Sequence, residues 1–266
     1  MTEAGVTGLQ LLVGDTLGVL RNLSEEEWSA ESGCTGWTIK DLANHLAATF
    51  TVVNDPVNAL DGVTAEVSLE AINDVMVNAG ADMDPADVLA SSESQKDDAI
   101  AAVAAMQAAE YKGATATLGD VGTYELHWFA DALCFDHLCH LHADILSPRG
   151  PVTAAAPAVD EARLSPALEW LIEVIPQWSG PDLAKALTAP VDVVLTGIST
   201  KRFQLRPNGT DIVDVVRGTS GAGASISGDS LEALSWLTGR TDKVLATSLD
   251  GDTALASAVL AAIKAV

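Results

Sequence analysis

The sequence predicts an α+β fold in which a helical first part, residues 1–150, precedes a mixed second part, residues 151–266. Apolar residues, mostly leucines, recur at helical spacing in the first part. Short β-type runs bounded by turn residues appear only after residue 190. A segment rich in proline and glycine, residues 148–151, separates the two patterns and indicates a linker between two domains.

The composition is that of a folded, acidic protein. Hydrophobic residues make up 48% of the 266 positions and charged residues 19%, which excludes a disordered chain. The formal net charge is −23, from 37 acidic and 14 basic residues. A surface this negative repels phosphate backbones and anionic lipids, so we expect no nucleic-acid partner and no membrane partner.

The cysteines and the chain start bear on the cellular compartment. The cysteines are Cys34, Cys134 and Cys139. Their odd number and irregular spacing argue against a disulfide scaffold, and the last two are predicted to be small buried side chains. No basic-then-apolar segment opens the chain, and no apolar run approaches the roughly 20 residues that span a bilayer. We therefore expect a soluble cytoplasmic protein.

Two capping signals mark helix starts in the first part, after a leucine-rich helix over residues 9–23. Ser24 with Glu27 predicts a short helical turn. Thr38 with Asp41 predicts a helix that ends before Pro56.

Three further helices complete the first part. Residues 55–84 contain a weak helix, and Asp84-Pro85 has the residues of an N-cap and first helical position for an alanine-rich helix to about Tyr111. Residues 124–146 are predicted as the last helix, which stops before Pro148.

The second part is predicted to alternate helices and strands. A helix is expected over residues 165–175, and another over residues 231–237 that stops at Gly239. A last helix runs to about Lys264, after an apolar run at residues 244–249. Residues 207–209 form a turn signal. The β-type runs are residues 191–195, 202–205, 212–216 and 224–226.

Histidine and carboxylate side chains suggest a metal site. Asp136 and His140 are four residues apart, so on a helix they project from one face. His45 lies on a different predicted helix. Two ligands from one helix and one from another give a three-ligand site with an open position, as in catalytic zinc sites. The alternative is a hydrogen-bonded Asp–His pair on a solvated face, with His45 a separate structural residue.

Neighbouring side chains compete for these roles. His142 lies about 200° around the helix from His140, so the two cannot both ligate one metal. His137 shares the apolar face of the helix. Asp144 is favoured as an ordinary exposed acid near the helix end, with a carboxylate that holds the His140 ring as the alternative.

Arg240 follows a predicted helix C-terminus, where a cation interacts favourably with the helix dipole. The alternative is recognition of a substrate carboxylate, which arginine binds through two parallel hydrogen bonds. The chain has no GxGxxG or GxxxxGK[ST] loop and no GxSxG elbow, so its sequence supports neither a nucleotide cofactor nor a serine hydrolase triad.

Residues 36–45, G-W-T-I-K-D-L-A-N-H, resemble the G-W-[ST]-x-x-D-L-x-x-H signature of the mycothiol-dependent maleylpyruvate isomerase family. The D-x-x-x-H spacing of Asp136 and His140 is similar to the family's second motif, which more commonly has glutamate first. Gly228-Asp229, Trp236-x-x-Gly239-Arg240 and Gly251-Asp252 resemble its C-terminal pattern.

The resemblance implies a DinB-like metal-binding four-helix bundle at residues 1–150 and a sterol-carrier-like α+β domain at residues 151–266. It implies a divalent metal, usually zinc, on His45, Asp136 and His140, with mycothiol as the thiol cofactor. It also implies that a C-terminal arginine, for which we select Arg240, holds substrate carboxylates in a cleft between the domains.

The leading functional hypothesis is a metal-dependent, thiol-using isomerase or transferase that acts on a small electrophilic or carboxylate substrate. Maleylpyruvate-type cis–trans isomerisation is its most specific form. The alternative is a non-catalytic metal-containing protein that binds an apolar small ligand. A regulator that senses metal or thiol stress is a third hypothesis, and the acidic charge means that it would act through another protein.

Overall fold

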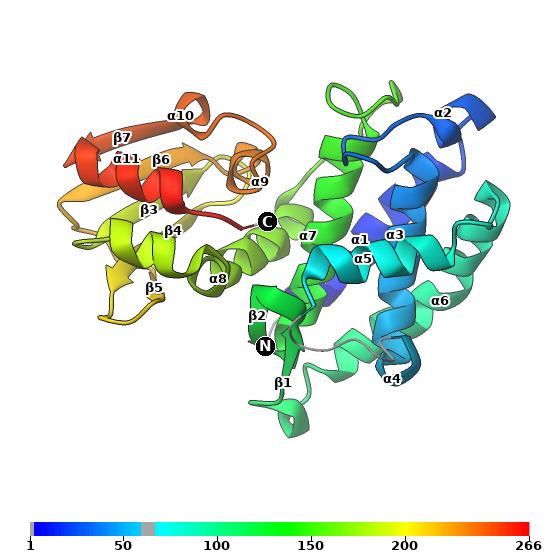
Figure 1. Ribbon diagram of the computed structural model, residues 1–266, viewed down its shortest axis with the longest axis horizontal. Coiled ribbons are helices and arrows are strands. Elements are labelled where there is room, and N and C mark those ends of the chain that lie inside the picture. The colour runs from blue at the N-terminus through cyan, green and yellow to red at the C-terminus, as the bar shows by residue number, and fades with distance from the viewer. Residues whose placement is uncertain (1–2, 60–66, 266) are drawn as a thin grey trace. The chain divides into compact units, whose positions relative to one another are not determined.

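The computed structural model describes residues 3–59 and 67–265 of the chain, and it divides into two compact units. Unit 1 is Met1–Ala158 and unit 2 is Val159–Val266 (Figure 1). The α+β class predicted from the sequence is confirmed, with helices dominating unit 1 and a five-stranded sheet in unit 2. Part of the weak helical stretch, residues 60–66, lies outside the described residues.

Helices α1, α3, α6 and α7 form the core of unit 1. Helix α3 packs along α6, and α1 packs along α7 (Figure 1). These helices are α1 (Glu3–Leu20), α3 (Ile39–Asn54), α6 (Pro85–Ala105) and α7 (Phe129–Cys139). The other described helices of this unit include α2 (Glu25–Ser29), α4 (Pro56–Ala59), α5 (Leu69–Ala79) and the 3₁₀ turns η1 (Ala109–Tyr111), η2 (Gly119–Val121) and η3 (Leu126–Trp128).

Both predicted capping boxes are confirmed. The Thr38 hydroxyl accepts the Asp41 backbone N–H at 3.2 Å, and the Asp41 carboxylate accepts the Thr38 backbone N–H at 3.0 Å. Ser24 and Glu27 cap α2 in the same way. The start of α3 is therefore fixed locally, and this start places His45 on the face that is buried in the bundle.

The predicted helix over residues 124–146 is wrong at its beginning. A hairpin of β1 (Thr115–Leu118) and β2 (Gly122–Glu125) extends to Glu125, the turn η3 follows, and α7 starts only at Phe129. Gly119 and Gly122 adopt φ angles of 49° and 136°, which glycine tolerates and other residues rarely adopt. Helix α6 also ends earlier than predicted, at Ala105.

The end of that last bundle helix is unusual. After Cys139 the chain continues as a π-helical turn, η4 (His140–Ile145), in which the Leu146 N–H bonds the Leu141 carbonyl five residues back. Such wide turns occur mostly as single insertions in α-helices, frequently at functional sites.

Unit 2 contains a mixed sheet with strand order β5-β4-β3-β6-β7. Strands β3 and β6 are parallel, and the other neighbours are antiparallel. The strands are β3 (Val191–Thr196), β4 (Lys201–Pro207), β5 (Val213–Arg217), β6 (Ala224–Asp229) and β7 (Thr247–Gly251). The helices are α8 (Glu161–Ala186), α9 (Glu232–Leu237), α10 (Lys243–Ala246) and α11 (Thr253–Ala262).

The predicted β-type runs of unit 2 correspond to strands β3 to β6. Gly239 has a φ of 70° directly after the C-cap of α9, so its predicted role as the residue that ends this helix is confirmed. Helix α8 runs well beyond the predicted residues 165–175, with a kink at Gly180. Within the described residues, no helix combines the length and the apolar character needed to cross a membrane.

Candidate metal centre

The structure brings His45, Asp136 and His140 together inside unit 1. The Nε2 atom of His45 lies 3.4 Å from both carboxylate oxygens of Asp136. The Nε2 atom of His140 lies 3.2 Å from Oδ1 of the same carboxylate. His45 comes from α3, whereas Asp136 and His140 come from one face of α7 and its continuation, as the spacing of four residues predicts.

These separations match the coordination shell of a small divalent cation. Bonds of 2.0–2.1 Å from tetrahedral zinc to nitrogen and oxygen place the ligand atoms about 3.3 Å apart. N–H···O hydrogen bonds are commonly about 2.9–3.0 Å long, so 3.2 and 3.4 Å are long for direct hydrogen bonds. Two imidazoles and one carboxylate also form a donor set that catalytic zinc uses with a fourth position open. The three residues therefore fit a zinc-like ion.

Burial makes the charges of this cluster interdependent. Burial raises the pKa of the Asp136 carboxyl, but the charge of His45 and hydrogen bonds to His140 and His45 bring it well below its usual range. Burial lowers the pKa of His140, but hydrogen bonds to Asp136, Asp144 and Cys34 raise it well above its usual range. The two imidazoles thus favour the ionised carboxylate, which is the form that binds a cation.

The Trp37 ring packs against one side of the cluster. The Trp37 ring centroid lies 5.3 Å from that of His45, and the His45 and His140 rings meet edge to face at 5.4 Å. His45 is only 4% exposed, and its Nδ1 atom is buried without a hydrogen-bond partner within the described part of the chain. The Nε2 atom of His45 is therefore the nitrogen that faces the carboxylate.

The other histidines lie outside this cluster. His137 is buried against Phe50, its Nδ1 lies 3.1 Å from the Thr16 hydroxyl, and burial lowers its pKa to about 4. His127 pairs with Glu125 at 3.3 Å. Neither these two nor His142 joins a metal-competent group among the residues that the structure describes.

Asp144 is not the exposed acid that was favoured from the sequence. It is fully buried, and its Oδ2 lies 2.9 Å from Nδ1 of His140. The Cys34 sulfur lies 3.7 Å from the same nitrogen. The spacing of four residues between Asp144 and His140 is the sequence signal for this contact. The burial of Asp144 is not predictable in the same way, because the loop at Gly33 that packs against Asp144 lies more than a hundred residues earlier in the sequence. Cys134 and Cys139 are buried as predicted.

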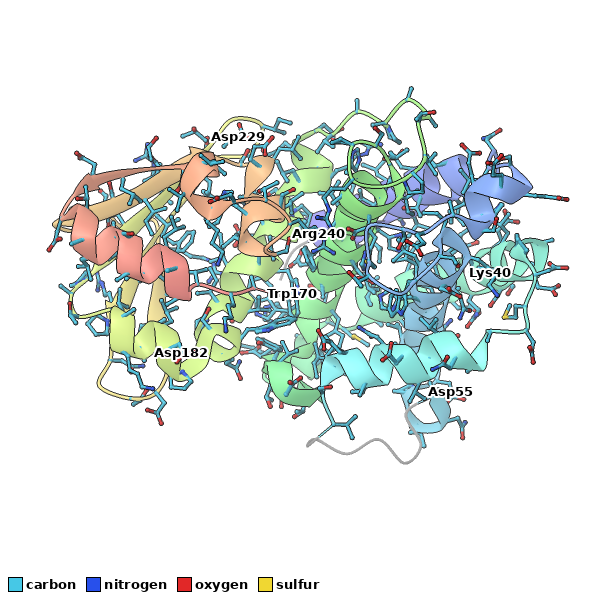
Figure 2. All side chains as sticks on the ribbon, turned by 45° about the horizontal axis from the view of Figure 1, so that its top comes forward. Lys40, Asp55, Trp170, Asp182, Asp229 and Arg240 are labelled. Atoms are coloured by element: carbon cyan, nitrogen blue, oxygen red, sulfur yellow. The ribbon has the colours of Figure 1, made fainter. Side chains whose placement is uncertain are left out.

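Arg240 lies in unit 2, on the turn after α9 (Figure 2). Its backbone N–H bonds the Ser235 carbonyl at 2.8 Å, which is the return bond expected after the left-handed Gly239. The side chain is half-buried. Its local position is consistent with both alternatives derived from the sequence, the helix-dipole contact and carboxylate recognition.

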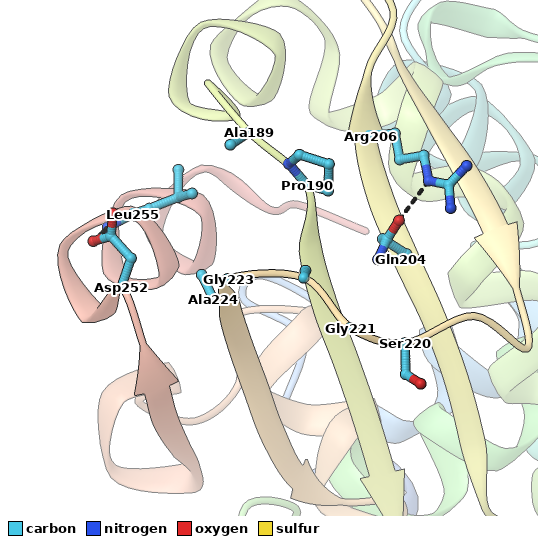
Figure 3. A pocket seen from close by; sticks show the side chains of 11 residues that line it. Ala189, Pro190, Gln204, Arg206, Ser220, Gly221, Gly223, Ala224, Asp252 and Leu255 are labelled. Carbon is cyan, nitrogen blue, oxygen red and sulfur yellow. Dashed lines mark hydrogen bonds between the residues drawn. The ribbon is translucent and has the colours of Figure 1, made fainter.

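Unit 2 also contains a hollow of about 470 Å³ at one end of its sheet (Figure 3). Arg206 donates through Nε to the Gln204 side chain there, and Gln204 donates to the buried Asp192 at 2.7 Å. Polar groups thus form part of the lining, together with small residues such as Ala189 and Ala224. Such a wall does not favour an exclusively apolar ligand.

Comparisons with known proteins agree with the fold. The chain resembles the crystal structure of the mycothiol-dependent maleylpyruvate isomerase with a TM-score of 0.58 and 16% identity, over 94% of this chain and 96% of that one. A histidine-to-alanine mutant of that isomerase matches equally well. At this identity the likeness shows the fold alone. Comparison with curated protein sequences gives no significant match.

The sequence profile of the mycothiol maleylpyruvate isomerase N-terminal domain matches residues 9–145, which is just over half of the chain. This stretch contains His45, Asp136 and His140 and ends with the π-helical turn. The chain therefore belongs to the mycothiol maleylpyruvate isomerase N-terminal domain family.

Proposed function

We propose that this protein is a metal-dependent, thiol-using isomerase or transferase, with His45, Asp136 and His140 as the ligands of a divalent metal. The observation that carries the proposal is the convergence of three donor atoms within 4.8 Å of one another, with the two imidazoles 3.4 and 3.2 Å from the Asp136 oxygens, which suits tetrahedral zinc. Family membership supports mycothiol as the thiol, because the family and its solved relative are described by that thiol. Maleylpyruvate-type cis–trans isomerisation is the most specific form of the proposal.

A bound zinc ion would lower the pKa of a coordinated thiol, and thiolates add reversibly to activated cis double bonds and so permit rotation. The chain's own residues set the conditions for this chemistry. As metal ligands, Asp136 would contribute one negative charge and the two imidazoles would be neutral. A zinc ion on these three residues would therefore keep one net positive charge, which favours an anionic thiolate. Burial of His45 and the adjacent Trp37 ring exclude water from one side of the cluster.

We also propose that Arg240 binds a carboxylate of the substrate. Its guanidinium offers the planar fork that pairs with a carboxylate through two hydrogen bonds, which lysine cannot reproduce. Arg240→Lys and Arg240→Ala should then both raise the KM for a dicarboxylate substrate and leave zinc content unchanged. Equal KM values in both variants and the unsubstituted protein would rule out this role.

Metal content and turnover test the main proposal together. The zinc-loaded protein is mixed with mycothiol and maleylpyruvate, and formation of the trans isomer is followed with and without the thiol. His45→Ala and Asp136→Asn should lose both zinc and turnover. His127→Ala is the matched control, since His127 lies outside the cluster, and it should keep both.

The outcomes separate the parts of the proposal. Equal zinc content in His45→Ala and the unsubstituted protein would show that the metal site is wrong. Full zinc content without isomerisation would remove maleylpyruvate as the substrate and leave the metal site standing. Retention of an apolar ligand by a catalytically silent zinc protein would favour the non-catalytic alternative.

A further inference from the structure

We propose that Asp144 is a positioning residue of the metal centre, which accepts the Nδ1–H of His140 and so directs Nε2 of that ring toward Asp136 and His45. This inference rests on the proposed metal function and extends it to a residue outside the ligand set. His140 alone uses both ring nitrogens within the cluster, with Nε2 at 3.2 Å from Asp136 and Nδ1 at 2.9 Å from Asp144.

Distance and chemistry select Asp144 over Cys34 as the partner of Nδ1. The Asp144 carboxylate oxygen lies 2.9 Å from Nδ1, in the range of a charge-assisted hydrogen bond. The Cys34 sulfur lies 3.7 Å away and is a weak acceptor. Asp144 is fully buried, so water does not compete for its carboxylate.

The backbone around Asp144 is clamped by a distant loop. The Gly33 N–H donates to the Asp144 carbonyl at 2.8 Å. A Cβ atom on Gly33 would lie 2.7 Å from both Cα and Oδ1 of Asp144, so only glycine permits this approach. Arg149 donates to the Gly33 carbonyl at 2.8 Å and lies 3.7 Å from Oδ1 of Asp144. The guanidinium partly offsets the charge of the buried carboxylate.

This arrangement decides which nitrogen of His140 is available. A neutral imidazole carries one proton, and a hydrogen bond from Nδ1–H to a carboxylate leaves the lone pair on Nε2. Metal-ligating histidines commonly have such an outer partner, which fixes both the tautomer and the ring orientation. Without Asp144, His140 would be free to place its proton on Nε2, where the proton competes with the cation.

Cys34, His140 and Asp144 also form a second group of three metal-competent side chains. The separation of 2.9 Å between Nδ1 and Oδ2 is shorter than the roughly 3.3 Å edge of a tetrahedral zinc shell. It is instead an ordinary hydrogen-bond length. The geometry therefore argues against a second ion here and leaves Asp144 as the partner of His140.

Zinc affinity, measured by competition with a chromogenic chelator, tests the assignment. Asp144→Ala should weaken zinc binding by about 10–100-fold, the range found for outer partners of metal ligands. Asp144→Asn, which keeps a neutral acceptor oxygen, should lose less. Two controls should stay within about threefold of the unsubstituted protein: Cys34→Ala, and Asp131→Asn, which changes a buried acid elsewhere on α7.

A second measurement reports on the ring itself. Imidazole ¹H–¹⁵N spectra of the zinc-loaded protein should show a slowly exchanging proton on Nδ1 of His140, and Asp144→Ala should speed the exchange of this proton with water. Circular dichroism verifies that each variant is folded, and the nearly isosteric Asp144→Asn provides the reading if Asp144→Ala does not fold.

Two results would overturn the proposal, and a third would overturn the metal function on which it rests. One is that both Asp144 variants bind zinc as tightly as the unsubstituted protein does. Another is an Nδ1 proton on His140 of the zinc-loaded protein that exchanges as fast in the unsubstituted protein as in Asp144→Ala. The third is failure of the unsubstituted protein to bind zinc, which would instead refute the proposed metal function on which the role of Asp144 depends.

Discussion

Gly33 sets a tight local constraint near the candidate metal centre. Its missing side chain lets one loop approach the Asp144 backbone, which in turn positions a carboxylate beside His140. Gly33→Ala should destabilise unit 1 by about 1–3 kcal/mol, because the added methyl group must displace backbone atoms. It should also weaken zinc binding. Urea unfolding and chelator competition measure the two effects.

Gly14 provides the control for this substitution. It lies inside α1, and a Cβ atom there would meet no heavy atom within 4 Å. Gly14→Ala should therefore be neutral or stabilising by up to about 1 kcal/mol, since alanine has the higher helix propensity. If both alanine variants unfold at the same urea concentration, the close approach at Gly33 has no energetic importance.

Individual site residues were predictable to different degrees. Asp136 and His140 could be paired from sequence because four residues make one turn of a regular helix. Asp144 has the same interval from His140, but the chain between them is a π-helical turn, and its burial depends on Gly33 and Arg149. Such a contact between distant segments leaves no periodic signal in a single sequence.

At the scale of elements, the cap of α3 anchors the helix that carries His45. Thr38→Ala removes the acceptor for the Asp41 N–H and should lower the free energy of unfolding by about 1 kcal/mol. Thr38→Ser keeps the hydroxyl and should recover most of this loss. Urea unfolding compares the two variants, and an alanine variant as stable as the serine variant would contradict the capping account.

Helix α8 is tied to two strands of unit 2 by ion pairs of Glu169. This carboxylate lies 2.7 Å from Lys201 of β4 and 3.0 Å from Arg217 of β5. Burial raises the pKa of Glu169, but hydrogen bonds and charge from the two cations lower it below its usual value. Its contribution to stability is therefore present above the unfolded-state pKa and is lost as pH falls through the lower folded-state pKa.

Glu169→Gln should accordingly destabilise the protein by about 1–2 kcal/mol at pH 7, with a smaller difference as pH falls below about 5. Urea unfolding over a pH series measures this trend. Asp182→Asn is the control, because Asp182 is 68% exposed and 4.0 Å from Lys185, and it should have little effect. A Glu169→Gln effect that is constant with pH would contradict the ion-pair explanation.

Element prediction succeeded where a local residue pattern determines the structure. The caps of α2, α3 and α6 and the end of α9 follow from their own few residues. The β1–β2 hairpin was missed, because its short strands contain little apolar alternation and depend on glycine conformations. Helix α8 continues past Pro176 because packing against the rest of unit 2 outweighs the local helix-breaking tendency.

At the scale of the whole molecule, the net charge is −23, and the excess carboxylates repel one another in the folded state. Added salt shortens the screening length from about 10 Å at 0.1 M to about 3 Å at 1 M. Sodium chloride should therefore raise the Tm, and about 1 kcal/mol of relief corresponds to roughly 2–4 °C in a protein of this size. Calorimetry in salt and in sucrose of equal osmolality separates screening from general osmolyte effects. An unchanged or lower Tm in salt would contradict this expectation.

The overall α+β class followed from the sequence because the change from helical to strand periodicity is long and marked by Pro148 to Pro151. The order of strands in the sheet did not. Strand β6 pairs in parallel with β3 across two intervening strands, and no local pattern specifies that partner.

All three proposed metal ligands lie in unit 1, whereas the arginine proposed to bind carboxylates lies in unit 2. On these two proposals, activation of the thiol and selection of the substrate belong to different units of the protein. Replacement of unit 2 by recombination would then change the substrate and leave the metal ligands of unit 1 unchanged. Such a division makes the substrate the more readily evolved property, and the ligand triad the more constrained one.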